Sequence, residues 1–236
     1  HFVARIADRT GKTGDLIETT QVMFPTIHHR SATGRDRQTQ RVCSTDIFLP
    51  NGTRHHHTAS AAGGEFLSTL ASHHGNRPII VQRDYTLPSW FDATWLVLAT
   101  SHSGNTEETV QAAESALKKE ATVIVIATGG ILAGLAETSP NCYLIPSIGG
   151  QPPRTAFGHI FSRQLACMEA LDILPKQSHE QRQAMLQRLT QINEQFDVLG
   201  DPEGDIALLA STMMDHPLSV VGPTELTPAL NRFKNQ

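Results

Sequence analysis

Apolar runs alternate with helical periodicity along the middle of the chain. Residues 95–99 form a short apolar run, and residues 121–127 form a second, continuous run that is rich in β-branched side chains. Such runs are typical of strands that are buried on both faces of a parallel sheet. Between them Val110, Ala113 and Leu117 recur at steps of three and four residues, which predicts an amphipathic helix.

The same alternation continues on both sides of this unit. Further strands are predicted at 77–82 and 141–146, and a further helix at 131–138. This order implies βαβ units with right-handed crossovers, so the predicted fold class is α/β, with a doubly wound parallel sheet flanked by helices. Ligands of such sheets bind beyond the carboxyl ends of the strands, where the turns at 101–106 and 128–130 are expected.

The N-terminal part is less regular. Residues 1–59 show no periodicity apart from a candidate short strand at 46–49, and they are expected to be largely irregular. Residues 60–64 are small, which predicts a turn, and residues 65–70 predict a short helix.

The C-terminal part is mostly helical. A helix is predicted at 161–174, and a long, polar helix at 180–199 has the character of a connector between domains. Residues 217–222 predict the first strand of a new sheet, and 224–236 the helix that follows it. Because one strand and one helix cannot bury their own apolar faces, a second domain is expected to begin here.

Composition narrows the class of protein. The net charge of -4 without a basic run argues against a nucleic-acid partner. No apolar stretch approaches the length of a membrane span, and the first residues lack a signal-peptide pattern, so no membrane partner is expected. The three cysteines have no CxxC spacing and are interpreted as reduced thiols of a cytoplasmic protein.

Histidine is the unusual residue of the composition, with 12 copies that cluster at 28–29, 55–57 and 73–74. Adjacent histidines lack the spacing that metal ligands need on one element. They are therefore interpreted as solvated loop residues, and no metal site is predicted.

The turn after residues 95–99 carries the most specific chemistry. Ser101, Ser103 and Thr106 surround a Gly-Asn pair, directly before two glutamates that begin the predicted helix. A helix N-terminus offers unpaired N–H groups and a positive dipole end, and hydroxyls add donors without charge. The turn has neither the lysine of a Walker loop nor a GxGxxG pattern. The alternative is ordinary helix capping, but three hydroxyls around one turn favour a phosphate site.

Arg154 is the second candidate. It follows two prolines at a predicted helix start, and its charge is permanent. The planar guanidinium suits a phosphate or an oxyanion that develops during a reaction. The alternative is a surface arginine that pairs with a carboxylate.

Four motifs carry a resemblance to a known family. Residues 101–109, SHSGNTEET, resemble the phosphate loop of sugar isomerase (SIS) domains, which is usually close to SYSGNTEET. The TEET ending is similar to one branch, the bifunctional phosphoglucose/phosphomannose isomerases. Residues 83–90, 127–136 and 151–161 resemble that branch's RDYxLPxW, TTGGxLAxLA and QPRxxxGxxF patterns, the last with one additional proline. The resemblance covers about 60–236.

This resemblance implies a fold and a site. The fold would be an SIS domain, a flavodoxin-like three-layer sandwich, followed by the start of a second similar domain. Ser101, Ser103 and Thr106 would hold the phosphate of the sugar, and Arg154 would stabilise an enediolate. Ser60 matches the serine of the family's GMGGSAxGG segment, which touches the sugar phosphate; a plain packing turn is the other interpretation of Ser60.

The implied domain organisation has four parts: a poorly defined N-terminal region (1–59), a first SIS domain (60–175), a connecting helix (176–200) and an incomplete second SIS domain (201–236).

The resemblance also implies an activity. A complete member would interconvert glucose 6-phosphate or mannose 6-phosphate with fructose 6-phosphate through an enediol(ate), without a cofactor, as a cytoplasmic homodimer. In the family a segment like 232–236 precedes an Asn-Glu-Asn sequence whose glutamate is the general base, and that glutamate has no match here. We therefore expect a truncated form or a member without the chemistry.

Two other functions remain open. A regulatory SIS module that senses sugar phosphates needs only the binding loop. A transferase-type SIS domain is disfavoured because no N-terminal cysteine nucleophile is present.

Overall fold

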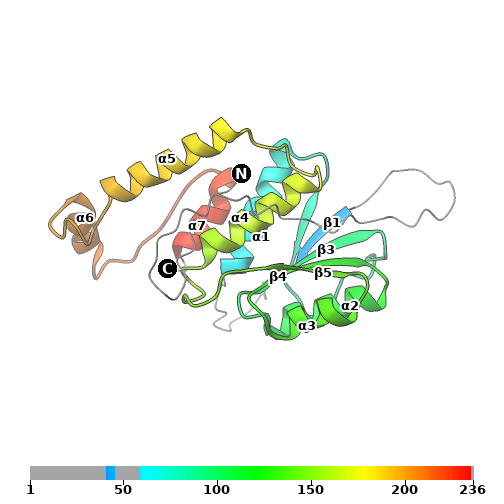
Figure 1. Cartoon of the computed structure of the whole chain (residues 1–236). Helices are drawn as coiled ribbons and strands as arrows, with labels where there is room; N and C mark the ends of the chain where they lie inside the picture. Colours follow the sequence, from blue (N-terminus) through cyan, green and yellow to red (C-terminus); the bar gives the residue numbers. More distant parts are fainter. Residues whose placement is uncertain (1–40, 46–58, 235–236) are drawn as a thin grey trace, which may run out of the picture. The chain divides into compact units, whose positions relative to one another are not determined.

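The computed structural model describes residues 41–45 and 59–234, and within them the centre is a five-stranded parallel sheet (Figure 1). The strand order is β2-β1-β3-β4-β5, which is the flavodoxin-like order. The sheet therefore confirms the predicted doubly wound α/β fold. The strands are β1 (Arg41–Thr45), β2 (Ile79–Gln82), β3 (Trp95–Thr100), β4 (Thr122–Ala127) and β5 (Cys142–Pro146).

Helices cover both faces of this sheet. On one face α1 packs on α4, and α7 packs on α1, whereas α2 and α3 lie on the opposite face (Figure 1). The result is a three-layer sandwich. The helices are α1 (Ala59–His74), α2 (Glu107–Lys118), α3 (Gly130–Thr138), α4 (Phe157–Ala170) and α7 (Thr227–Lys234).

The core lies around the two central strands β3 and β4. Every residue of β3 is buried, and so is every residue of β4 except Thr122. On the face of α2 and α3, Val97 and Val125 pack against Ala113 and Ala116 of α2. Alanine has no side chain beyond Cβ, so these positions let the helix approach the sheet closely and hold the α2 N-terminus at the end of β3.

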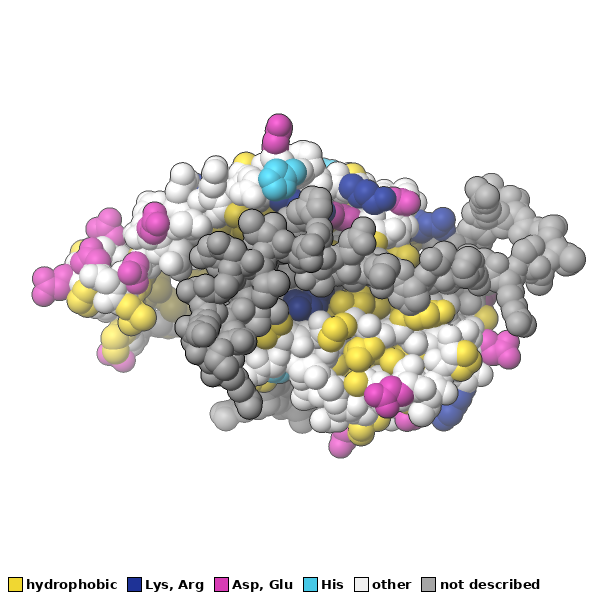
Figure 2. Space-filling view, viewed as in Figure 1, with side chains coloured by type: hydrophobic (Ala, Val, Ile, Leu, Met, Phe, Trp, Pro, Cys, Tyr) yellow, Lys and Arg dark blue, Asp and Glu magenta, His cyan; other side chains and the backbone are white. Residues whose placement is uncertain are grey.

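Strand β5 forms an edge of the described sheet, and apolar side chains remain exposed on it. Leu144 and the nearby Ile148 are each 39% exposed, and Ile131 at the start of α3 is 53% exposed. Figure 2 shows hydrophobic side chains gathered over this part of the molecule.

Strand β1 was not predicted from the sequence. The expectation that residues 1–59 are largely irregular is wrong for 41–45, which pair with β2 on one side and β3 on the other. The segment RVCST mixes polar and apolar residues and carries no strong strand pattern, so its pairing depends on two strands that come later in the chain. The candidate strand at 46–49 lies outside the described residues.

The predicted turn at 60–64 is also wrong. These small residues belong to α1, which is much longer than the helix predicted at 65–70. The structure gives the reason at Gly63, where an added Cβ would collide with the side chain of Gln164 in α4. Gly63 is therefore a helix-packing position, and the small residues of 60–64 were misinterpreted as a turn.

The strand predicted at 217–222 is absent from the structure. These residues are described but belong to no strand, and they lead into the short 3-10 helix η1 (Thr224–Leu226) and then α7. Apolar character alone does not make a strand when no neighbouring strand offers hydrogen bonds. The proposed division into two SIS domains stays a prediction.

Two helices between α4 and α7 complete the described chain. The helix α5 (His179–Gln195) belongs to a separate compact unit and has no buried residue. Its N-terminus carries a capping box, in which Ser178 and Gln181 bond reciprocally to each other's backbone N–H. The helix α6 (Asp205–Met213) is likewise without buried residues. In the described part of the chain, no helix has the length and apolarity that a membrane span requires.

Candidate phosphate-binding site

The loop 101–106 joins the buried end of β3 to the start of α2. The N–H of Ser101 donates to the carbonyl of Ile126 at 3.0 Å, so the loop leaves the sheet only after this residue. The Ser101 hydroxyl is buried, lies 2.8 Å from the Thr106 hydroxyl and accepts a hydrogen bond from the Gly104 N–H at 3.1 Å. The loop therefore curls so that two of the three predicted hydroxyls meet.

The third hydroxyl and the helix N-terminus lie beside this pair. Ser103 is exposed, and its Oγ accepts a hydrogen bond from the Asn105 N–H at 3.2 Å. Thr106 is the N-cap residue of α2, but its side chain makes no capping hydrogen bond. This arrangement contradicts the capping alternative for Thr106 and leaves N–H groups of the first helical turn without a side-chain partner from the cap.

The loop requires glycine at its centre. Gly104 has a φ of 74°, in the left-handed region, and an added Cβ would collide with the carbonyl oxygen of Gly129. Gly130 has a φ of 73°, and a Cβ there would lie 2.5 Å from the Asn105 Oδ1. Both glycines are needed because two backbone turns lie against each other.

The turn after β4 holds the loop in place. The carbonyl of His102 accepts hydrogen bonds from the Thr128 N–H at 3.0 Å and the Thr128 hydroxyl at 2.7 Å. The Ile131 N–H donates to the Asn105 Oδ1 at 3.0 Å. The two turns that were predicted at the carboxyl edge of the sheet are therefore joined by three hydrogen bonds.

The loop before β3 brings a tyrosine to the first turn of α2. Burial, a hydrogen bond to Glu108 and the charges of Glu108 and Glu107 raise the pKa of Tyr85, with burial as the largest cause. Tyr85 also lines an open cleft of about 490 Å³ along α2, together with Asn105, Glu107 and Lys118. Asn105 and Glu107 place this cleft next to the candidate phosphate site, although Ser101, Ser103 and Thr106 do not line it.

Arg154 lies in the turn that precedes α4, and its side chain is exposed. It comes after β5, and the phosphate loop comes after β3, so both lie beyond carboxyl ends of strands in one parallel sheet. The structure records no hydrogen bond or ion pair between the Arg154 side chain and Ser101, Ser103 or Thr106. Ser60 lies in the first turn of α1, and its side chain is outside the described part of the structure.

Sequence reasoning missed a buried glutamine beneath the loop. Gln164 of α4 is fully buried, and its Nε2 donates to the Thr100 hydroxyl at 3.2 Å. Its Oε1 has no hydrogen-bond partner among the residues that the structure describes. Gln164 occupies the apolar face of α4 with Ile160 and Cys167, and a polar residue at such a position is the signal that could have identified it.

No cluster of three or more metal-ligating side chains occurs in the part of the chain that the structure describes. His73 and His74 lie at the end of α1. The other two histidine clusters, 28–29 and 55–57, lie outside the described residues.

Comparisons with known proteins agree with the fold and the loop. No family model matches the chain. The chain is 33% identical over 182 residues to a bifunctional phosphoglucose/phosphomannose isomerase of Caldicellulosiruptor bescii, which covers 75% of this chain and 52% of that protein. It is 40% identical over 101 residues to the protein of the same name from Thermoplasma acidophilum, covering 43% of this chain and 30% of that protein. At its longest match, the chain spans about half of a curated relative.

A solved structure supports the fold alone. The C-terminal domain of glucosamine-fructose-6-phosphate aminotransferase from Francisella tularensis superposes with a TM-score of 0.54 at 13% identity, over 80% of this chain and 52% of that one.

The fold is a doubly wound α/β sandwich, and its loop at 101–106 resembles the phosphate loop of sugar isomerase (SIS) domains. The curated relatives are named bifunctional phosphoglucose/phosphomannose isomerases, and this chain aligns with 52% of the length of one and 30% of the length of the other. The resemblance predicted from the sequence is thereby confirmed.

Proposed function

We propose that the chain binds a hexose 6-phosphate and is part of an aldose-ketose isomerase. The reaction would interconvert glucose 6-phosphate or mannose 6-phosphate with fructose 6-phosphate through an enediol(ate). Homology to proteins named for this activity supports the proposal, and so does the loop that resembles a phosphate-binding sequence. The proposal includes a cytoplasmic homodimer that uses neither metal nor cofactor.

The phosphate is proposed to lie on the hydroxyls of Ser101, Ser103 and Thr106 and on the N-terminus of α2. The observation that carries this proposal is the uncapped N-terminus of α2 beside converging hydroxyls. Unpaired N–H groups at a positive helix end bind anions, and hydroxyls can reorient to donate to a phosphate oxygen. Ser60 remains a further candidate contact.

Arg154 is proposed to act on the other end of the sugar. Moving a proton between C1 and C2 places negative charge on an oxygen, and a guanidinium stabilises such a charge. Its exposed side chain at the carboxyl edge of the sheet is compatible with this role. A guanidinium stays protonated at neutral pH, so the base that moves the proton must be a residue other than Arg154.

The test combines calorimetry with an isomerase assay on the 236-residue chain. Fructose 6-phosphate should bind, and Ser103→Ala should weaken its binding about tenfold through the lost hydroxyl. Absence of binding to the unaltered chain would refute the proposed function. Robust turnover would show that another base exists in these residues.

A regulatory sugar-phosphate sensor is the second candidate, because the loop alone would suffice for it. Arg154→Ala separates the two functions. In an isomerase it should abolish turnover by the complete enzyme, whereas a sensor should keep much of its affinity for hexose 6-phosphate.

A further inference from the structure

The turn that carries Arg154 is held by a residue far along the chain. The Nη2 of Arg232 in α7 donates a hydrogen bond to the backbone carbonyl of Arg154 at 3.0 Å, across 78 residues of sequence. The same guanidinium lies over the ring of Phe157, with its central carbon 4.4 Å from the ring centroid. One side chain therefore contacts both the Arg154 turn and the first residue of α4.

The ring under Arg232 belongs to a packed aromatic group. Phe157 stacks on Phe161 with ring centroids 5.5 Å apart, and Phe66 of α1 lies 5.7 Å from Phe157. By contrast, the Arg154 turn has only two described backbone hydrogen bonds of its own. The Thr155 N–H donates to the Pro152 carbonyl, and the Ala156 N–H donates to the Pro153 carbonyl. Arg232 thus connects the Arg154 turn, which has few hydrogen bonds of its own, to the packed aromatic group.

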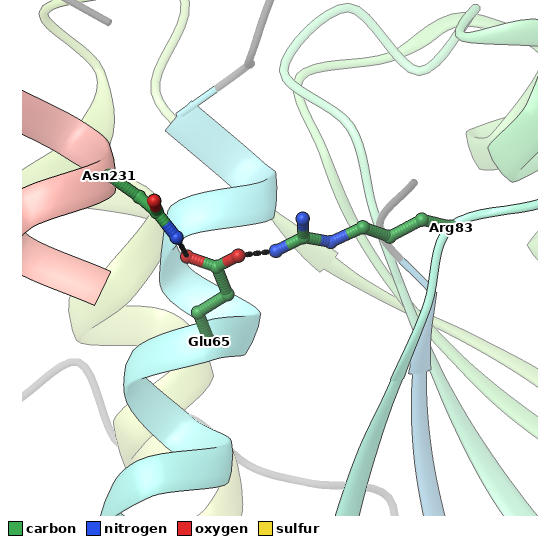
Figure 3. Close-up of polar contacts among 3 residues, drawn as sticks. All are labelled: Glu65, Arg83 and Asn231. Carbon is green, nitrogen blue, oxygen red and sulfur yellow. Dashed lines mark hydrogen bonds and ion pairs between the residues drawn. The ribbon is translucent and has the colours of Figure 1, made fainter. Parts of the chain in front are cut away.

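The residue next to Arg232 anchors α7 to the rest of this unit. Asn231 donates from Nδ2 to the Oε2 of Glu65 at 3.3 Å, and the other carboxylate oxygen of Glu65 pairs with Arg83 (Figure 3). Glu65 lies on α1 and Arg83 directly follows β2. Because α7 is fixed at Asn231, the backbone that presents Arg232 has little freedom to move away from the turn.

Within the described part of the chain, the guanidinium groups of Arg154 and Arg232 have no carboxylate partner. Among the described residues, neither Arg154 nor Arg232 lies within ion-pair distance of an acidic side chain. Burial and the nearby charge of Arg154 lower the pKa of Arg232, although a guanidinium stays protonated at neutral pH. The hydrogen bond and the ring contact therefore hold two like charges close together, which favours an anion at this edge of the sheet.

We propose that Arg232 is a positioning residue, which fixes the Arg154 turn so that the Arg154 guanidinium faces the oxyanion end of a bound sugar phosphate. The inference rests on the proposed function, since it assigns Arg154 to the same site. In this proposal, the role of α7 is to hold the Arg154 turn in place through Arg232.

The test uses two probes, one for the phosphate-binding end of the site and one for the end at Arg154. Inorganic phosphate reports on the serine and threonine loop. 5-Phosphoarabinonate adds a carboxylate that resembles an enediolate in shape and charge. Calorimetry on the 236-residue chain should compare the unaltered protein with Arg232→Ala, Arg232→Lys, Arg154→Ala and the double alanine variant. Lys234→Ala, on the same helix and exposed, is the matched control.

Arg232→Ala should weaken 5-phosphoarabinonate binding about tenfold, and Arg232→Lys about threefold, because lysine keeps the charge but loses the flat contact with Phe157. Phosphate affinity and the control should stay within about twofold of the unaltered protein. The double variant should bind no more weakly than Arg154→Ala, since a positioning residue acts only through the group it positions.

Three results would contradict the inference. If Arg154→Ala weakens binding and both Arg232 variants do not, Arg232 has no positioning role and the proposed function stands. A further loss in the double variant would make Arg232 an independent contact. Failure of the unaltered chain to bind either probe would overturn the proposed function and this inference together.

Discussion

The phosphate loop and the Arg154 turn are held in opposite ways. In the loop, the Ser101 and Thr106 hydroxyls meet across five residues, and Asn105 bonds to Ile131 across 26. The Arg154 turn depends on Arg232, which is 78 residues away. The first is built within one βαβ unit, and the second needs a helix that returns from the far end of the described chain.

This difference separates two tasks of the proposed site. Binding a phosphate needs fixed N–H groups and hydroxyls, which a strand, a turn and a helix supply together. Placing a cation over a developing charge needs precise orientation of a long side chain, which packing from other elements provides. The comparison predicts that the two can be damaged separately.

Gly104→Ala should have the largest effect and should affect the phosphate loop. The left-handed φ and the collision with the Gly129 carbonyl should lower the free energy of unfolding by about 2–5 kcal/mol and abolish phosphate binding. Urea denaturation and calorimetry measure both. Gly134→Ala is the control, because nothing lies near its Cβ in α3, and it should stabilise the fold by about 0.5–1 kcal/mol. Equal effects at the two glycines would mean that the loop tolerates the added methyl group.

Glu65→Ala should have the second-largest effect, and it should affect the Arg154 turn. It removes the carboxylate that Arg83 and Asn231 share, and the Glu65–Arg83 pair is mostly buried, with side-chain exposures of 17% and 11%. We expect unfolding free energy to fall by about 2–3 kcal/mol, with weaker 5-phosphoarabinonate binding and little change for inorganic phosphate.

The exposed Glu137 in α3 provides the control for this variant. Glu137→Ala should change the unfolding free energy by less than about 0.5 kcal/mol. If Glu65→Ala reduced the affinity for both probes equally, the two parts of the site would not be separable.

Ser101→Ala should have a moderate effect on stability. It removes the acceptor of the Gly104 N–H, which is buried, and the partner of the Thr106 hydroxyl, so unfolding free energy should fall by about 1–3 kcal/mol. Ser103→Ala is the matched comparison, because Ser103 is exposed and should cost less than about 0.5 kcal/mol while still weakening phosphate binding. A larger loss of stability at Ser103 would reverse the assignment of structural and binding roles.

Alkaline pH should have the smallest effect. Burial raises the pKa of the Cys167 thiol in α4 to about 12. The unfolded thiol releases its proton near pH 8.5–9, so between there and pH 12 the native state binds more protons and unfolding free energy falls as pH rises. At pH 10 the contribution of Cys167 should be a loss of about 1–2 kcal/mol.

Urea midpoints at pH 8 and pH 10 test this expectation, with Cys167→Ala as the control that should lose part of the pH dependence. An unchanged pH dependence in the variant would show that Cys167 ionises alike in the folded and unfolded states. Cys142, whose pKa burial raises to about 11, should act in the same direction.

The sequence by itself determined the βαβ core and the chemistry of the loop. The continuous apolar runs predicted buried strands at β3 and β4, and nearly every residue of both strands is buried. The turn between β3 and α2 is specified by its own glycine and hydroxyls. These features depend on contacts between near neighbours in the chain, where pattern and turn chemistry are reliable guides.

Only the tertiary structure decided the position of β1, the helical state of residues 60–64 and the contacts of α7. Strand β1 gains its hydrogen bonds from β2 and β3, Gly63 packs on Gln164, and Arg232 reaches back to Arg154. Each of these depends on a partner that is remote in sequence, and no local pattern encodes which remote segments meet. The loop could therefore be predicted from its local sequence, whereas the contacts that hold the Arg154 turn follow from how the elements pack.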